Sequence, residues 1–188
     1  MVLVRRFTWV QSRRKSNVIL CSCKMQHDYP YFAFMNNIID NIRSTRTSLL
    51  GTIADLSAEQ LNETPAGFNN NIIWNLGHMV AAQQGVCYMR GGAPIIVEEK
   101  YWINYKPGSK PGEFVGAEEI QKIKDLMVST LDRLTTDVGT NIFDNYTSWT
   151  TRYGVNLADV NDAIHFLSFH EGLHTGVIMS LMKLVKKD

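Results

Sequence analysis

The sequence has few cysteines and lacks a long apolar segment. Its three cysteines, Cys21, Cys23 and Cys87, cannot form the dense disulfide framework that stabilises small secreted proteins. Cys21 and Cys23 have no second pair of cysteines with which to complete a zinc site. No apolar run approaches the roughly 20 residues that a membrane-spanning helix needs. We therefore expect a reducing, cytoplasmic setting and no membrane partner.

Strong charge of one sign is also missing. The chain carries 19 Lys and Arg against 18 Asp and Glu, which gives a formal net charge of +1. A charge of this size provides no general attraction to nucleic acid or to an anionic membrane surface, so we expect no nucleic-acid partner. Hydrophobic residues make up 45% of the 188 residues, which is enough for one compact domain with a buried core.

Residues 1–27 contain basic residues and no acidic one. A segment rich in arginine and serine and free of acids is typical of a mitochondrial transit peptide. The alternative, which we favour, is an upstream extension of the reading frame with Met25 as the biological start. On either interpretation we expect residues 1–27 to be a disordered basic extension, and residues 28–188 to form the folded domain.

Apolar residues recur at helical spacing in four stretches of the chain. They predict one helix over residues 31–55, a second over about 70–90 and a third that begins near Ala117. The pair Asn156 and Asp159 predicts the cap of a long last helix. Alternating strand patterns are weak throughout. The sequence therefore predicts an all-α protein, a four-helix bundle, and a bundle whose first helix exposes an apolar face often forms a homodimer.

His170 and His174 lie one helical turn apart on the predicted last helix, so both imidazoles can reach one cation. The letters H-E-G-L-H also match the zinc-peptidase pattern H-E-x-x-H, in which Glu171 would be the general base. Such a peptidase needs a third ligand further along the chain. Only fourteen residues follow His174, and Asp188 is the sole candidate among them. The peptidase interpretation therefore fits this sequence poorly.

A third ligand must come from upstream, where few histidines are available. His27 lies in the basic N-terminal segment, and His165 projects roughly 140° and 180° away from His170 and His174. His78 lies on the core-facing side of the predicted second helix. By itself it would be interpreted as a hydrogen-bonded core histidine, but with the other pair it completes a predicted metal site of three histidines.

Two motifs in the chain carry a family resemblance. The W-x-L-G-H string from Trp74 to His78 and the H-E-G-L-H-T-G string from His170 to Gly176 resemble the two signatures of the DinB/YfiT-like superfamily. The resemblance spans most of the chain, from about residue 31 to residue 185. It implies a four-helix bundle that holds a divalent metal ion on His78, His170 and His174.

The chemistry of this donor set favours a catalytic metal over a structural one, because three neutral ligands leave at least one position of the cation open. Imidazole suits several divalent ions, and we expect zinc or nickel. The resemblance implies a thiol S-transferase that acts on a small-molecule thiol. The alternatives are a metal-dependent hydrolase, with Glu171, Asn75 or Asp162 as the base, and a non-catalytic metal-binding bundle.

Three residues near these motifs also have structural interpretations. Asn75 lies one turn before His78, and we expect it to form a hydrogen bond to a metal-binding histidine. Glu171 points about 100° away from His170, and we expect a solvated or capping carboxylate. Cys87 is predicted to be a small buried apolar residue.

Two long connections interrupt the predicted helices, over residues 93–116 and 139–156. Connections longer than about 12–15 residues tend to be functional or disordered. Five aromatic residues concentrate in them: Tyr101, Trp102, Tyr105, Tyr146 and Trp149. These side chains either form the wall of a substrate pocket at the metal site or cover the apolar ends of the bundle. The sequence leaves both alternatives open.

Overall fold

The computed structural model describes residues 29–186, and helices make up most of them. In chain order the helices are α1 (Tyr29–Thr52), α2 (Ala58–Asn62), α3 (Ile72–Gln83), the π-helix η1 (Gln84–Met89), α4 (Glu99–Tyr105), α5 (Ala117–Val138) and α6 (Val160–Val185). Two short strands, β1 (Trp149–Thr150) and β2 (Asn156–Leu157), pair antiparallel. The all-α prediction is confirmed. The basic extension predicted over residues 1–27 lies outside the described residues.

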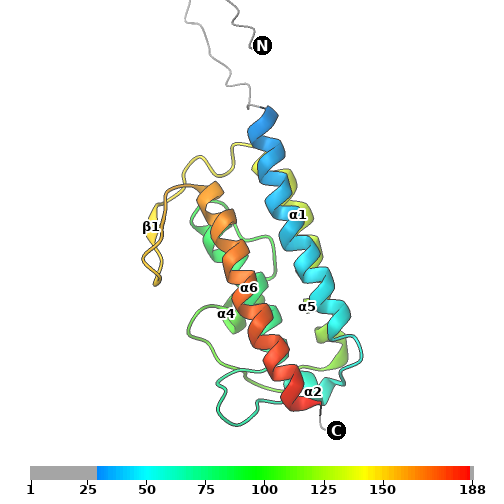
Figure 1. Ribbon diagram of the computed structural model, residues 1–188. Helices are drawn as coiled ribbons and strands as arrows, with labels where there is room; N and C mark the ends of the chain where they lie inside the picture. The colour runs from blue at the N-terminus through cyan, green and yellow to red at the C-terminus, as the bar shows by residue number, and fades with distance from the viewer. Residues whose placement is uncertain (1–28, 187–188) are drawn as a thin grey trace, which may run out of the picture.

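The four long helices α1, α3, α5 and α6 pack side by side. Helix α1 contacts α5 and α6, and α3 contacts the same two helices. Figure 1 shows α1, drawn from blue to cyan, and α6, drawn from orange to red, running in the same direction. Within residues 29–186, none of the helices has both the length and the apolar composition to cross a membrane.

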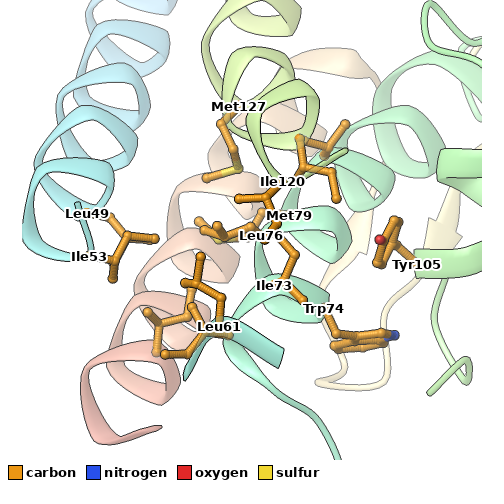
Figure 2. Packing of buried hydrophobic residues seen from close by; sticks show 14 of the residues in the cluster. Leu49, Ile53, Leu61, Ile73, Trp74, Leu76, Met79, Tyr105, Ile120 and Met127 are labelled. Atoms are coloured by element: carbon orange, nitrogen blue, oxygen red, sulfur yellow. The ribbon is translucent and has the colours of Figure 1, made fainter. Parts of the chain in front are cut away.

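Two apolar clusters fill the interior, one toward each end of the long helices. The first, shown in part in Figure 2, joins the C-terminal halves of α1 and α6 to α3 and to the N-terminal half of α5, through residues such as Leu49, Leu181, Ile72 and Ile120. The second joins the N-terminal halves of α1 and α6 to the C-terminal half of α5 and to η1, which continues α3, through residues such as Ile39, Ala163, Leu134 and Tyr88. Helices α3 and α5 therefore run parallel to each other and antiparallel to α1 and α6.

These directions explain the length of the first predicted connection. Because α3 and α5 are parallel, the chain after η1 must return along the length of the domain before α5 can begin. Residues 93–116 make this return, and they include the short helix α4, which was not predicted from the sequence. By contrast, α5 ends and α6 begins at the same end of the domain. Residues 139–159 therefore do not have to run along the length of the domain. They instead include the β1–β2 hairpin.

The helix boundaries follow from capping side chains. Asn71 is the N-cap of α3, and its side chain accepts a hydrogen bond from Trp74 N at 2.9 Å. The N-cap of α6 is Asp159, whose side chain accepts hydrogen bonds from the first turn of the helix. The prediction that Asn156 caps this helix was wrong, because Asn156 lies in β2. The second predicted helix has about the right extent, but it is an α-helix that continues as a π-helix.

Most of the loop aromatics are part of the core. Tyr101 and Tyr105 are buried in the first cluster and Trp102 packs against it, whereas Tyr146 packs against the second. Their burial supports the interpretation that they cover the apolar interior. Trp149 differs, because its ring lies in the hairpin with the Arg90 guanidinium 4.8 Å from its centroid.

Candidate metal centre

The three histidines singled out by the sequence lie together. His78 comes from α3, and His170 and His174 come from successive turns of α6. One ligand-capable atom from each histidine lies within 4.8 Å of the others. Within residues 29–186, this cluster contains no aspartate, glutamate or cysteine. His165 is an exposed residue elsewhere on α6, and His27 lies outside the described residues.

Backbone and aromatic contacts hold His78 in place. Its Nδ1 lies 2.7 Å from the Tyr105 carbonyl oxygen. Because a carbonyl can only accept a hydrogen bond, Nδ1 of the neutral ring carries the proton and Nε2 keeps a free lone pair. The Trp74 ring stacks on the imidazole at 4.8 Å between centroids. These contacts leave Nε2 as the atom of His78 that could bind a cation.

Gly77 makes the close approach of Tyr105 possible. A Cβ atom at residue 77 would lie 2.5 Å from the Tyr105 ring, a separation that would force the ring to move. The glycine in the W-x-L-G-H motif is therefore explained by packing: only a residue without a side chain lets α4 sit against α3 and bring the Tyr105 carbonyl to His78.

His174 has a side-chain partner of the expected kind. Its Nδ1 lies 2.8 Å from Asn75 Oδ1. The amide nitrogen of Asn75 already donates to the Asn71 carbonyl oxygen at 2.7 Å and to Asn70 Oδ1 at 3.1 Å. The oxygen of Asn75 is therefore the atom that faces His174, and it accepts the Nδ1–H. The predicted hydrogen bond between Asn75 and a histidine of the cluster is confirmed, with Asn75 as the acceptor, and Nε2 of His174 is left free.

His170 lacks a corresponding partner. Among the described residues, none forms a hydrogen bond with its buried Nδ1 atom. A buried polar atom without a partner is costly and needs a physical explanation. Coordination of a cation by the His170 ring would provide one. This nitrogen, together with the two oriented imidazoles, fits a site for a divalent cation.

The electrostatic surroundings keep the three imidazoles neutral. Burial lowers the pKa of His170 to about 3 and that of His174 to about 4, and it also lowers the pKa of His78. The positive charge of Arg152 contributes to the lowered pKa of each of the three. Neutral imidazole is the form that binds metal, so the site is ready to bind at neutral pH.

Glu171 is buried, and the prediction of a solvated or capping carboxylate was wrong. It is only 1% exposed, and it forms an ion pair with the fully buried Arg46, with Nη2–Oε1 at 2.7 Å and Nε–Oε2 at 3.0 Å. Arg46 also donates to the carbonyl oxygens of Met79 and Met127 and to Gln83 Oε1. A single side chain of α1 thereby contacts α3, α5 and α6.

Arg46 was not predicted as a buried residue, although its position in the sequence gave a signal. It lies on the same helical stripe of α1 as Ile42 and Leu49, both of which are buried. A charged residue on an apolar stripe needs a buried partner. The sequence alone could not identify that partner, because Glu171 lies 125 residues further along the chain.

The other residues considered as bases or nucleophiles are engaged elsewhere. Asp162 Oδ2 accepts a hydrogen bond from Ala158 N at 2.8 Å, at the start of α6. Cys87 is a free, fully buried thiol, as predicted, and burial raises its pKa well above the usual range. Such a thiol is inert.

A cavity of about 420 Å³ is lined in part by Trp74 and Tyr105. Polar groups of Asn104, Ser109 and Lys110 contribute to its lining, and none of the three histidines does. Trp74, through its ring, and Tyr105, through its carbonyl oxygen, also contact His78.

Comparisons with known proteins place these residues in a family context. The sequence model of the DinB superfamily matches residues 26–178, a span that includes all three histidines, Asn75 and Arg46. A comparison with curated proteins finds no match to the chain.

Proposed function

Because the chain belongs to the DinB superfamily, we propose that it is a metal-dependent enzyme that holds a divalent cation on His78, His170 and His174 within a four-helix bundle. The observation that carries this proposal is the histidine cluster. Two of its rings are oriented by hydrogen bonds, and the third has a buried nitrogen that has no hydrogen-bond partner among residues 29–186. Zinc or nickel is the cation we propose, since both suit imidazole ligands.

The proposed roles of the residues follow from their contacts. Tyr105 and Asn75 would act on the metal indirectly, by fixing the tautomers of His78 and His174. A divalent cation on three neutral ligands would lower the pKa of a bound thiol or water. Trp74 would cover one face of His78 and exclude water from it.

The activity we propose is the transfer of a small-molecule thiol, through its sulfur, to an electrophilic substrate. In such a reaction the thiol sulfur bonds to an electrophilic carbon, the leaving group departs with its electron pair, and the thiol proton passes to water. A metal that favours the thiolate removes the need for a protein base. This agrees with a cluster in which, among residues 29–186, no carboxylate takes part.

The hydrolase alternative receives less support from the geometry. It needs a base that activates water beside the metal. Both oxygens of Glu171 face Arg46, the Asn75 side chain is an amide, and Asp162 is bonded to the backbone at the start of α6. None of the three candidates has a free carboxylate at the histidine cluster.

The first test of the proposal is the metal content of the purified full chain after incubation with zinc or nickel. We expect about one ion per chain in the wild type and in His165→Ala, and none in His78→Ala or His174→Ala. Transfer of free cysteine to an activated aryl chloride, followed as thioether and chloride release, tests the activity. A wild-type protein that binds neither ion would overturn the proposal.

Chelation of the metal from the same protein samples distinguishes a catalytic role of the metal from a structural role. The two apolar clusters and the Arg46 network join the long helices through contacts that need no metal. Loss of thiol transfer upon chelation, with the helical content retained, would support catalysis. Unfolding upon chelation would instead support the non-catalytic bundle.

A further inference from the structure

The hairpin in the connection between α5 and α6 has a tightly fixed turn. Thr151 N donates to the Val155 carbonyl oxygen at 2.8 Å, and Gly154 N donates to the Thr151 carbonyl oxygen at 2.9 Å. Gly154 has a φ of +79°, a conformation that favours glycine. Thr151 is buried, and β2 packs against α6. The two residues at the tip, Arg152 and Tyr153, are therefore held in a defined place beside α6.

Arg152 and Tyr153 form a unit at this tip. The guanidinium donates from Nη2 to the Tyr153 hydroxyl at 2.6 Å and lies over the Tyr153 ring at 4.8 Å from its centroid. Both residues are exposed. A guanidinium held against a ring loses less freedom when it binds an anion than a free side chain would.

Aromatic rings lead from this unit to the histidine cluster. The Tyr153 ring lies 6.3 Å from Phe166 and 5.3 Å from Phe169, and Phe166 lies 6.0 Å from His170. Tyr153 is 44% exposed and Phe169 is 50% exposed. An apolar surface that is open to solvent thus connects Arg152 with one of the proposed metal ligands.

The charges around the cluster are not balanced. Three neutral imidazoles leave the charge of a divalent cation intact, and Arg152 adds a further positive charge that acts on all three histidines. Glu171, the acidic residue beside His170 in the sequence, is neutralised by Arg46. A ligand of this site therefore gains from carrying negative charge of its own.

We propose that Arg152 is a specificity-determining residue that selects substrates with a carboxylate, while the apolar part of the substrate lies on Tyr153, Phe166 and Phe169. This inference rests on the proposed function and names its substrate class: thiols that carry a carboxylate a few bonds from the sulfur. The sulfur occupies the histidine site and the carboxylate meets the guanidinium.

The test compares two probe thiols of nearly equal size, 3-mercaptopropionate and the neutral 3-mercaptopropionamide. Each is titrated into the cobalt-loaded full chain, and the visible spectrum of the cobalt reports binding. In the wild type we expect the acid to bind more tightly than the amide. Arg152→Gln should weaken binding of the acid about fivefold and leave the amide unchanged, whereas Arg152→Lys should retain part of the preference.

Arg90→Gln is the matched control, because Arg90 also lies over an aromatic ring of the hairpin, that of Trp149. It should keep the preference of the wild type. If Arg152→Gln binds cobalt and retains the full preference for the acid, this inference is overturned and the proposed metal site survives. If the wild type takes up no cobalt, the proposed function fails and the inference fails with it.

Discussion

Asn75 Oδ1 accepts a hydrogen bond from His174 Nδ1 at 2.8 Å, which joins α3 to the side of α6 that carries the histidine pair. Asn75 is fully buried, and its amide nitrogen is held by the Asn71 carbonyl oxygen. The orientation of the amide, and with it the tautomer of His174, is therefore fixed by the backbone at the start of α3. Metal affinity should depend on this residue although it is no ligand.

Asn75→Ala should lower the affinity for zinc about 10- to 100-fold, because His174 loses the partner that orients it. Competition with a chromogenic chelator measures this affinity. Asn75→Asp, which keeps an acceptor oxygen, should recover much of it. The exposed Asn104→Ala is the control and should bind as the wild type does. Equal affinities for Asn75→Ala and the wild type would contradict the role given to Asn75.

Gly77→Ala should destabilise the protein by about 1–3 kcal/mol, because the new methyl group would collide with the Tyr105 ring. Displacement of Tyr105 should also weaken metal binding through the lost contact with His78. Gly176→Ala on α6 is the matched control. Nothing lies within 4 Å of a Cβ atom there, and alanine should stabilise the helix by up to about 1 kcal/mol. Urea unfolding of both variants distinguishes the two effects.

Arg46→Ala should lower the free energy of unfolding by about 3–5 kcal/mol, because Glu171 would be left as an unpaired buried charge. Replacing both partners by apolar residues, as in Arg46→Met with Glu171→Leu, should recover most of the loss. Arg43→Ala, which removes a solvent-exposed pair with Asp132, should cost about 1 kcal/mol or less. If the Arg46 and Arg43 variants lose the same stability, the buried pair does not have the role described.

Removal of the metal should leave the helices intact. The interior is filled by two apolar clusters that do not depend on the histidines, unlike small domains in which zinc supplies the folding energy. Far-ultraviolet circular dichroism of the chelated protein should keep its helical signal, while thiol transfer is lost. A collapse of the helical signal after chelation would show that the metal is structural.

The metal-free protein should become less stable as the pH falls from about 6.5 toward 4. The pKa of His170 is lowered to about 3 and that of His174 to about 4 in the folded state, whereas an unfolded histidine has a pKa of about 6.5. Between these values the unfolded chain binds protons that the folded chain does not, so the free energy of unfolding decreases. Urea unfolding at pH 7, 6 and 5 measures the decrease, and His170→Gln should show a shallower slope.

Much of the fold was readable in the sequence because helices obey local rules. Apolar spacing located the four long helices, and α5 begins at Ala117 as predicted. The spacing of His170 and His174 follows from the helical repeat, and the position of His78 on an apolar helix made it the remaining candidate. Local spacing could not reveal the π-helix after Gln83 or the short helix α4.

The sequence by itself determined the all-α class and the histidines that the domain brings together. Only the tertiary structure decided their surroundings. The partners of Arg46 and Asn75 lie 125 and 99 residues away along the chain, and Arg152 lies beside the cluster because a hairpin packs on α6. Such contacts depend on which helices are neighbours and on their directions. The neighbours and directions of the helices are set by the packing of whole apolar faces against one another, and a local sequence pattern does not reveal this packing.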